Sequence, residues 1–326
     1  MTARLRILYL PHPVVSETAL PLRQQVASLL RGQHEIPVLD HDRALPPQFR
    51  DVDVVVDPGG AAGTRPMADA ATSVQLWQIV GTGFDHFDLD YWRSKHIPVA
   101  NCPGIYTAVP LAECAMMFML MLARRYPVSH RALQEGTLYQ TFGRELEGCR
   151  LGLIGFGASA RQLARFSLAF GMRPSAIDIR DIGQDEARDF GLEVAGKPSD
   201  LDRLLTVSDF VSLHLHLNAE TRHIIDARRL GLMKPTAFLI NVARGALVDE
   251  DALREALVDG GIAGAGLDVF EREPPRPDDP LLHLPNVVST PHTAAATDGT
   301  LSRRAECVAQ NIDRIANGQQ ALYLLS

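Results

Sequence analysis

The stretch LGLIGFGASARQLARFSLAFG, residues 151–171, decides the fold. Its apolar beginning predicts a buried strand, and the amphipathic pattern after the glycines predicts a helix. Gly155 permits a tight turn, and Gly157 lets the backbone approach a pyrophosphate group. Ala160 is small enough for close packing of the helix on the strand. The segment therefore predicts the strand–turn–helix unit of a dinucleotide-binding domain.

The spacing after this turn supports a bound dinucleotide. The pyrophosphate would lie at the helix N-terminus, beside Ala158 and Ser159. Asp178 follows Ala160 by eighteen residues, at the end of the next expected strand, where it would accept hydrogen bonds from ribose hydroxyls. Its charge would repel a 2′-phosphate and favour NAD over NADP, although Arg180 nearby works against that preference. The alternative is a glycine-rich turn without a ligand, which this context disfavours.

Short apolar runs alternate with amphipathic stretches along the whole chain, which is typical of βα units around a parallel sheet. The length of 326 residues suits about two domains of ~150 residues each. In the first hundred residues we expect a helix at Glu17–Leu30 and strands near Arg6–Leu10, Ile36–Leu39, Asp53–Val56, Trp77–Val80 and Val99–Asn101. The second series has six expected strands, at Arg150–Ile154, Ser175–Ile179, Phe210–Leu215, Ala237–Asn241, Ala265–Val269 and Val287–Ser289.

Two helices complete this organisation, a long one at Val109–Ala132 and a last one at Ala296–Gly318. The second series offers no place for the last helix, so we expect it to return to the first domain. The predicted domains are residues 1–104 with 296–326, and residues 105–295. The chain would cross between them twice and leave a cleft.

Composition excludes several function classes. The net charge of −7 and the absence of a basic stripe give little support to a nucleic-acid partner. The four cysteines have no paired spacing, which suits reduced thiols in a cytoplasmic protein and argues against a metal site. The apolar run Cys114–Ala123 is shorter than the ~20 residues of a membrane span, so we expect a buried helix and no membrane.

Three later segments carry polar residues where buried strands should end. Arg244 follows one strand, Glu273 comes shortly after a second, and His292 follows a third. Ligands of open α/β sheets bind at the carboxyl ends of the strands. An arginine, a glutamate and a histidine would therefore meet beside a bound dinucleotide.

These segments resemble the D-isomer-specific 2-hydroxyacid dehydrogenase family, and the resemblance covers nearly the whole dinucleotide domain. The first domain is similar at Gly81–Asp85 and near Pro110–Glu113. The resemblance implies an α/β protein of two doubly wound parallel-sheet domains, a flavodoxin-like substrate domain and a Rossmann NAD domain. It also implies a homodimer, with which the Met-rich segment Leu111–Leu122 is compatible, although such helices are more often core.

By position, the resemblance implies that Arg244 grips the substrate carboxylate and polarises the keto oxygen. His292 would be the general acid in reduction of a 2-keto acid and the base in the reverse direction. Glu273 would hydrogen-bond the other imidazole nitrogen and raise the pKa of His292. Asp268 would bind the nicotinamide carboxamide. Substrate contacts are implied for Arg244, His292 and the backbone amides of Thr82 and Gly83, and cofactor contacts for Gly155, Gly157, Ala158, Ser159, Asp178, Leu215, Val242, Ala243, Arg244, Asp268, His292 and Ala294.

Some positions depart from the family pattern and leave the substrate open. His216 stands where relatives commonly have proline, Leu215 replaces a small or polar residue, and His86 stands where asparagine is common. Glyoxylate, hydroxypyruvate, pyruvate and phenylpyruvate-like acids all remain candidates, with NAD as cofactor and NADP less favoured.

Two alternatives are weighed against this reading. Formate oxidation is disfavoured because Glu273 gives His292 a carboxylate partner, whereas relatives that oxidise formate have glutamine there. An NAD(H)-sensing protein of the corepressor type has no supporting segment outside the core.

Overall fold

The computed structural model describes residues 3–12, 21–59, 63–85, 87–139 and 141–325. It divides into two compact units, one formed by Met1–Tyr106 with Thr297–Ser326 and the other by Thr107–Ala296. The sequence placed these boundaries within two residues, at 104/105 and 295/296. The last helix is thus part of the first unit.

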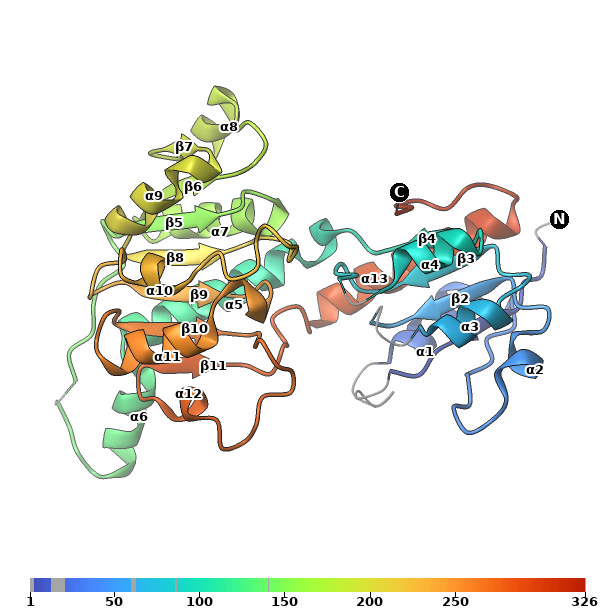
Figure 1. Cartoon of the computed structure of the whole chain (residues 1–326), viewed down its shortest axis with the longest axis horizontal. Helices are drawn as coiled ribbons and strands as arrows, with labels where there is room; N and C mark the ends of the chain where they lie inside the picture. Colours follow the sequence, from blue (N-terminus) through green and yellow to red (C-terminus); the bar gives the residue numbers. More distant parts are fainter. Residues whose placement is uncertain (1–2, 13–20, 60–62, 86, 140, 326) are drawn as a thin grey trace. The chain divides into compact units, whose positions relative to one another are not determined.

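The described part of the first unit contains a four-stranded parallel sheet in the order β1-β2-β3-β4 (Figure 1). Its strands are β1 (Ile7–Tyr9), β2 (Val54–Asp57), β3 (Leu76–Ile79) and β4 (Val99–Ala100). The expected strand at residues 36–39 is wrong as a full strand: that segment makes only single parallel bridges, Arg6 with Glu35 and Tyr9 with Val38. If this segment is counted as the element that pairs with the free edge of β1, the spatial order of the five elements along the chain is 2-1-3-4-5. This is the strand order of a flavodoxin-like sheet.

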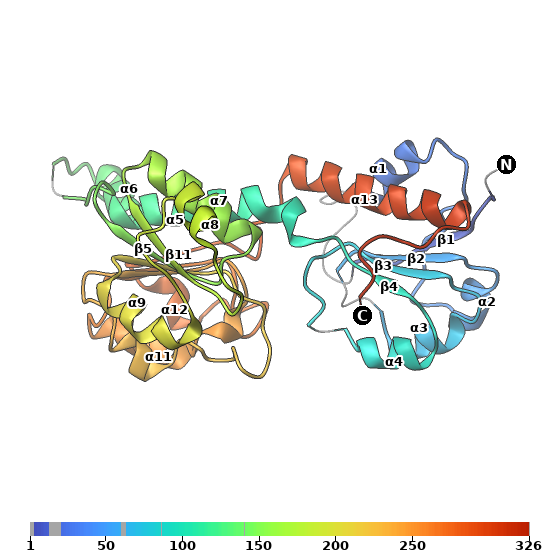
Figure 2. The same ribbon diagram turned by 90° about the horizontal axis from the view of Figure 1, so that it is seen from above.

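Helices cover both faces of this sheet, with α1 and α13 on one face and α3 and α4 on the other (Figure 2). The cores on the two faces are separate, and α13 contributes apolar residues such as Val308 and Ile312 to the first of them. The helices of the unit are α1 (Leu22–Leu29), α2 (Leu45–Phe49), α3 (Arg65–Ala70), α4 (Leu89–Ser94) and α13 (Asp298–Ala316).

The described part of the second unit contains a seven-stranded parallel sheet in the order β11-β10-β9-β8-β5-β6-β7. The order reverses between β5 and β8, and this reversal is where ligands bind in open α/β sheets. The strands are β5 (Arg150–Ile154), β6 (Arg173–Ile177), β7 (Ala195–Gly196), β8 (Phe210–Leu213), β9 (Phe238–Asn241), β10 (Gly264–Leu267) and β11 (Val287–Ser289). The sequence prediction missed β7, which is only two residues long.

Helices also cover both faces of this sheet, α5 and α7 on one face and α9, α11 and α12 on the other (Figure 2). The α-helices of the unit are α5 (Ala108–Ala123), α6 (Tyr126–Gln134), α7 (Ala158–Ala169), α8 (Gln184–Asp189), α9 (Leu201–Val207), α10 (Ala227–Leu230), α11 (Glu250–Val258) and α12 (Pro280–His283). The 3₁₀ turns are η1 (Gly104–Thr107), η2 (Pro198–Asp200) and η3 (Gly245–Leu247).

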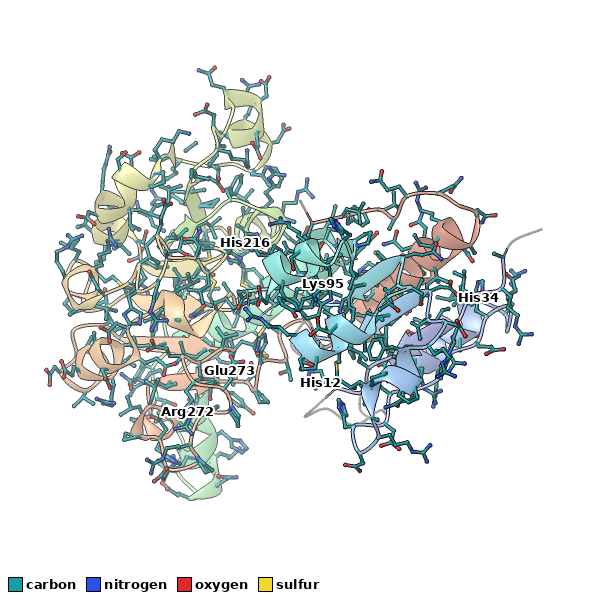
Figure 3. The ribbon with its side chains drawn as sticks, turned by 45° about the vertical axis from the view of Figure 1, so that its right-hand side comes forward. His12, His34, Lys95, His216, Arg272 and Glu273 are labelled. Atoms are coloured by element: carbon teal, nitrogen blue, oxygen red, sulfur yellow. The ribbon has the colours of Figure 1, made fainter. Side chains whose placement is uncertain are left out.

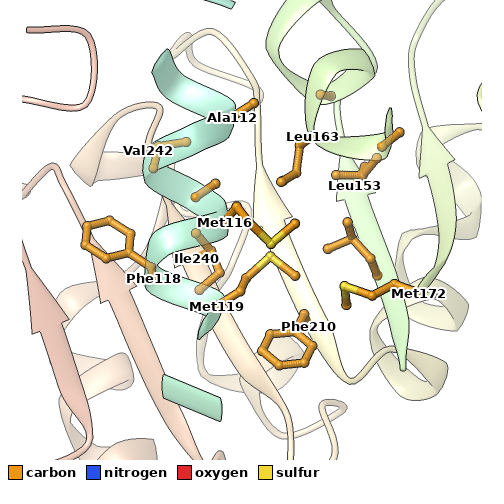
Figure 4. Close-up of a cluster of buried hydrophobic side chains, with 14 of the residues drawn as sticks. Ala112, Met116, Phe118, Met119, Leu153, Leu163, Met172, Phe210, Ile240 and Val242 are labelled. Carbon is orange, nitrogen blue, oxygen red and sulfur yellow. The ribbon is translucent and has the colours of Figure 1, made fainter. Parts of the chain in front are cut away.

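The Met-rich helix α5 is a core element. Met116 and Met119 meet Leu153 of β5, Leu163 of α7 and Ile240 of β9 in one apolar cluster (Figure 4). By length and composition, the 20 residues Gly104–Ala123 are apolar enough to cross a membrane, with a mean hydropathy of 1.7. More than half of this segment is nevertheless buried inside the protein, which agrees with the prediction of a buried helix.

The prediction of a single helix from Val109 to Ala132 is wrong. Two arginines separate α5 from α6, and Arg125 has a left-handed backbone with φ of 51°. A left-handed residue cannot continue a right-handed helix. The apolar pattern spans the break, so periodicity alone gave no sign of it.

Candidate dinucleotide and catalytic site

The glycine loop follows β5 at the point where the strand order reverses. Gly155 has φ of +86°, and a Cβ there would lie 2.6 Å from the carbonyl oxygen of His214. Only glycine fits that backbone. Gly157 is the opposite case, because nothing lies within 4 Å of the place where its Cβ would stand. This open space adjoins the first turn of α7, and the fully buried Ala160 seats that helix on the sheet.

His214 contacts the first turn of α7 through a hydrogen bond with Ser159. Its Nδ1 lies 2.9 Å from Oγ of Ser159, and its Nε2 lies 2.9 Å from Oγ of Ser212. Burial of the ring lowers the pKa of His214 to about 3, so the ring is neutral at physiological pH. A neutral imidazole has one donor and one acceptor, and each serine hydroxyl can complement either. Leu215, the next residue, packs beside Gly155.

Asp178 follows β6 and is tied to the glycine loop. Its Oδ2 accepts a hydrogen bond from the backbone amide of Phe156 at 2.6 Å, and its Oδ1 accepts one from the amide of Arg180 at 2.9 Å. A carboxylate has about four acceptor positions. Asp178 can therefore hold the loop and still accept hydrogen bonds from ribose hydroxyls.

The loop that carries Arg244 is held by the end of β9. The buried side chain of Asn241 donates to the Arg244 carbonyl oxygen at 2.8 Å and accepts from the Ala243 amide at 3.1 Å. Gly245 lies against the backbone of Phe270, and a Cβ there would overlap the Phe270 carbonyl group. Glycine is thus required for the close approach of the two loops. In the sequence, Asn241 is only the last residue of an expected strand, and this role was not predicted.

Glu273 and His292 form a hydrogen-bonded pair. Oε2 of Glu273 lies 2.7 Å from Nδ1 of His292, and its Oε1 accepts from the Phe270 amide at 3.0 Å. The hydrogen bond to Glu273 raises the pKa of His292 above its ordinary value, against the opposing effect of burial. Burial acts to raise the pKa of Glu273, but its hydrogen bonds outweigh burial and leave that pKa lowered. The His292 side chain remains 50% exposed.

Asp268 shapes the loop on which His292 stands. Its carboxylate accepts hydrogen bonds from the Thr290 hydroxyl at 2.6 Å and from the amides of Thr293 at 2.7 Å and Ala294 at 3.0 Å. Its backbone oxygen accepts from the His292 amide at 2.7 Å. His292 itself has a left-handed backbone with φ of 55°. The buried aspartate thus holds the histidine in a conformation that L-residues seldom adopt.

Arg244, Glu273 and His292 lie close enough to interact electrostatically. The charge of Arg244 adds to the lowering of the Glu273 pKa and offsets part of the rise in the His292 pKa. Glu273 and the adjacent Arg272 are on the loop that follows β10 (Figure 3). The structure therefore brings the three residues together at the carboxyl ends of neighbouring strands, although they are far apart in sequence.

The remaining predicted contacts belong to other loops. Thr82 and Gly83 are in the first unit, where the Asn101 side chain donates to the Thr82 carbonyl oxygen at 2.8 Å. Val242 is buried beside Ala243 in the loop after β9. His86 lies outside the described residues.

The second unit fits a dinucleotide. The open space at Gly157 suits a pyrophosphate, and α7 presents unpaired amides and the positive end of its dipole to that space. Asp178 stands at the ribose position of the fingerprint. Among the described residues, no group of three or more His, Cys, Asp or Glu residues suits a metal ion.

Comparison with known proteins agrees with this geometry. Residues 116–294 match the family model described as "D-isomer specific 2-hydroxyacid dehydrogenase, NAD binding domain". A glyoxylate reductase of Korarchaeum cryptofilum is 39% identical over 257 residues, which are 77% of this chain and 76% of the relative. A D-3-phosphoglycerate dehydrogenase of Methanocaldococcus jannaschii is 35% identical over 92% of this chain, which spans 57% of that relative's length.

A solved structure is similar over both units. The crystal structure of a D-lactate dehydrogenase from Aquifex aeolicus, complexed with NAD and lactic acid, has a TM-score of 0.81 and 29% identity. The match covers 96% of each chain.

Proposed function

The chain belongs to the D-isomer-specific 2-hydroxyacid dehydrogenase family, and from this premise we propose that Arg244, Glu273 and His292 are its catalytic residues. It is an NAD-dependent enzyme that interconverts a 2-keto acid and the corresponding 2-hydroxy acid. The hydrogen-bonded pair of His292 and Glu273 carries the proposal, since it provides a proton donor whose pKa is raised.

In keto acid reduction, Nε2 of His292 donates a proton to the keto oxygen, and in the reverse direction the same nitrogen accepts it. When bound, NADH would supply the hydride in reduction and NAD+ would take it up in the reverse direction. Glu273 holds Nδ1, so that the proton to be transferred is on Nε2, and it stabilises the imidazolium. Because the raised pKa keeps His292 protonated to higher pH, the acid form is available near neutrality.

Arg244 binds the substrate carboxylate and polarises the keto oxygen, with the fixed donor fork of its guanidinium. Its loop is held by Asn241 and by the close approach of Gly245 to Phe270, which fixes the backbone from which the side chain extends. For the backbone amides of Thr82 and Gly83, which belong to the first unit, contact with the substrate carboxylate stays a prediction from the resemblance. Relatives named as D-3-phosphoglycerate dehydrogenase and D-lactate dehydrogenase support D stereochemistry of the hydroxy acid.

The glycine loop, the first turn of α7 and Asp178 would hold NAD, since they offer the open space at Gly157 and a carboxylate at the ribose position. We propose that further contacts to the cofactor come from Ser159, Leu215, Val242, Ala243, Asp268 and Ala294. Asp268 also contacts the loop of His292, because its carboxylate accepts three hydrogen bonds from residues of that loop. We propose that it positions the histidine as well as the nicotinamide carboxamide.

A substrate panel tests this function. NADH oxidation is measured with 2-keto acids of increasing side-chain size, from glyoxylate through hydroxypyruvate and pyruvate to phenylpyruvate. We expect turnover on at least one of them. Tight NADH binding without turnover on any 2-keto acid would contradict the proposal and favour an NAD(H)-sensing protein.

We further propose that the protein is a homodimer. The segment 126–142, which includes α6, exposes the apolar side chains Tyr126, Leu133, Leu138, Tyr139 and Phe142, with Tyr139 exposed to 96%. Several exposed apolar side chains in one short stretch of the chain are compatible with a protein interface. Light scattering after size-exclusion chromatography should give twice the mass of the 35.7 kDa chain, and the mass of one chain would refute the dimer.

We also propose a cytoplasmic location. All four cysteines are free and buried, which suits a reducing compartment. Fractionation of the source cells tests this, and recovery in a secreted fraction would contradict it.

A further inference from the structure

We propose that Glu186 sets the preference for NAD over NADP by holding two arginines that would otherwise bind a 2′-phosphate. The inference rests on the proposed use of the glycine loop for the cofactor. In the sequence, Asp178 favours NAD over NADP, while Arg180, two residues away, works against that preference. The structure shows what occupies that arginine.

Arg180 makes a two-pronged ion pair with Glu186. Its Nη1 lies 2.7 Å from Oε2 and its Nη2 lies 2.8 Å from Oε1 of the same carboxylate. Nη2 also donates to the carbonyl oxygen of Phe156, in the glycine loop, at 2.8 Å. Both terminal nitrogens of this guanidinium are therefore engaged within the protein.

Arg161, on the first turns of α7, is the second arginine at this carboxylate. Its Nη2 lies 2.7 Å from Oε1 of Glu186. The guanidinium carbons of Arg161 and Arg180 lie 5.8 and 5.9 Å from the ring centroid of Phe156. Both cations thus flank a residue of the glycine loop, and one carboxylate from α8 serves both of them.

The charges explain the selectivity. The formal charges beside the ribose position add up to zero, because two carboxylates, Asp178 and Glu186, face two guanidinium groups, Arg161 and Arg180. Hydrogen bonds from Arg180 and Arg161 lower the pKa of Glu186, against burial, so this carboxylate is ionised at neutral pH. A 2′-phosphate would add a doubly charged group next to Asp178, and the guanidinium groups of both arginines already pair with Glu186. Without Glu186 the same cluster would carry one net positive charge and two unpaired guanidinium groups.

The nearby Lys197 does not change this balance. Its ammonium lies 2.7 Å from Asp181 and also donates to the carbonyl oxygen of Ile179 at 2.8 Å. Arg165, also on α7, stacks over the ring of Phe190 at 4.7 Å. The two arginines at Glu186 are therefore the cations on which the preference depends.

The test measures binding of adenosine 2′,5′-bisphosphate and of 5′-AMP by calorimetry, without turnover. Glu186→Gln keeps the shape of the side chain and removes its charge. We expect it to raise the affinity for the bisphosphate about tenfold or more, the usual effect of a charge-assisted hydrogen bond, while 5′-AMP changes by less than about twofold. The ratio of kcat/KM for NADPH over NADH should rise in the same direction.

A double-variant cycle assigns the gain to the arginine. Arg180→Gln alone should change the bisphosphate affinity little, because Glu186 already occupies that guanidinium. In the Glu186→Gln background the same substitution should remove most of the gain, so the two effects are strongly non-additive. Glu193→Gln is the matched control, because Glu193 also pairs with two arginines, Arg150 and Arg173. These arginines begin β5 and β6, whereas the glycine loop and Asp178 follow the other ends of the same two strands.

The outcomes separate this inference from the proposed function. An unchanged bisphosphate affinity in a folded Glu186→Gln protein, or an equal gain for 5′-AMP or in Glu193→Gln, would overturn the role of Glu186. Turnover of a 2-keto acid with NADH by the unaltered protein would still support the enzyme. A lack of binding of 5′-AMP and NADH to the unaltered protein would instead contradict the cofactor site itself.

Discussion

Two glutamates in the second unit hold cations beside the carboxyl ends of its strands, with different consequences. Glu273 binds His292, whose pKa it raises, and Glu186 binds Arg180, which is charged at every accessible pH. The first carboxylate therefore controls whether a proton is present. The second can only neutralise a charge that is always there.

This difference assigns the two regions to different tasks. The region around His292 can give and take a proton, and the histidine is half exposed. The region around Glu186 is charge-balanced and suits recognition of an uncharged ribose. The same kind of contact thus supports chemistry in one region and selectivity in the other, depending on whether the cation titrates.

The largest expected effect follows from removing the titrating partner. His292→Ala should reduce kcat for keto acid reduction by ~10²–10⁴-fold, the usual contribution of a general acid. Binding of NADH should fall far less, because the glycine loop is unchanged and His292 is only one of the implied cofactor contacts. Stopped-flow and steady-state assays at one pH measure both quantities.

His283→Ala is the control, because His283 ends the short helix α12 and hydrogen-bonds the Pro277 carbonyl oxygen. It should keep full turnover. Turnover in His292→Ala equal to that of this control would refute the assignment of the proton donor.

Arg244→Lys should have the next largest effect. Lysine keeps the charge but loses the two-pronged geometry, so kcat/KM for the keto acid should fall by ~10–100-fold. The affinity for NADH should change much less. If kcat/KM stayed within about twofold of the unaltered enzyme, Arg244 would not bind the substrate carboxylate.

A smaller effect separates the two glycines of the loop. Gly155→Ala forces a side chain onto a left-handed backbone and against His214, and should cost ~1–3 kcal/mol of unfolding free energy or more. Gly157→Ala meets no protein atom, so stability should hold while NADH affinity falls, on the order of tenfold. Denaturant titration and calorimetry measure the two quantities. Equal loss of stability in both variants would contradict this reading of the loop.

Much of this fold could be predicted, because apolar strands, glycine turns and amphipathic helices leave a strong periodic signal. The break between α5 and α6 and the two-residue β7 were not predicted. A left-handed arginine leaves no mark in the apolar pattern, and a strand of two residues has no period. Both depend on tertiary contacts.

The candidate site was predicted less completely. Spacing and resemblance indicated Arg244, Glu273 and His292, but not what holds them, such as Asn241 below the arginine loop. Glu186 went unnoticed, because an exposed-looking glutamate on a short helix has no motif. Its role depends on meeting Arg180 and Arg161 in space, which only the fold shows.

The pH dependence of kcat/KM in Glu273→Gln tests the central claim most directly. Reduction requires protonated His292, so its rate should fall as the pH rises through the raised pKa of that histidine. Loss of the carboxylate lowers this pKa, and the alkaline limb should move to lower pH, while the oxidation profile shifts in the same direction. An alkaline limb that stays in place in this variant would contradict the account.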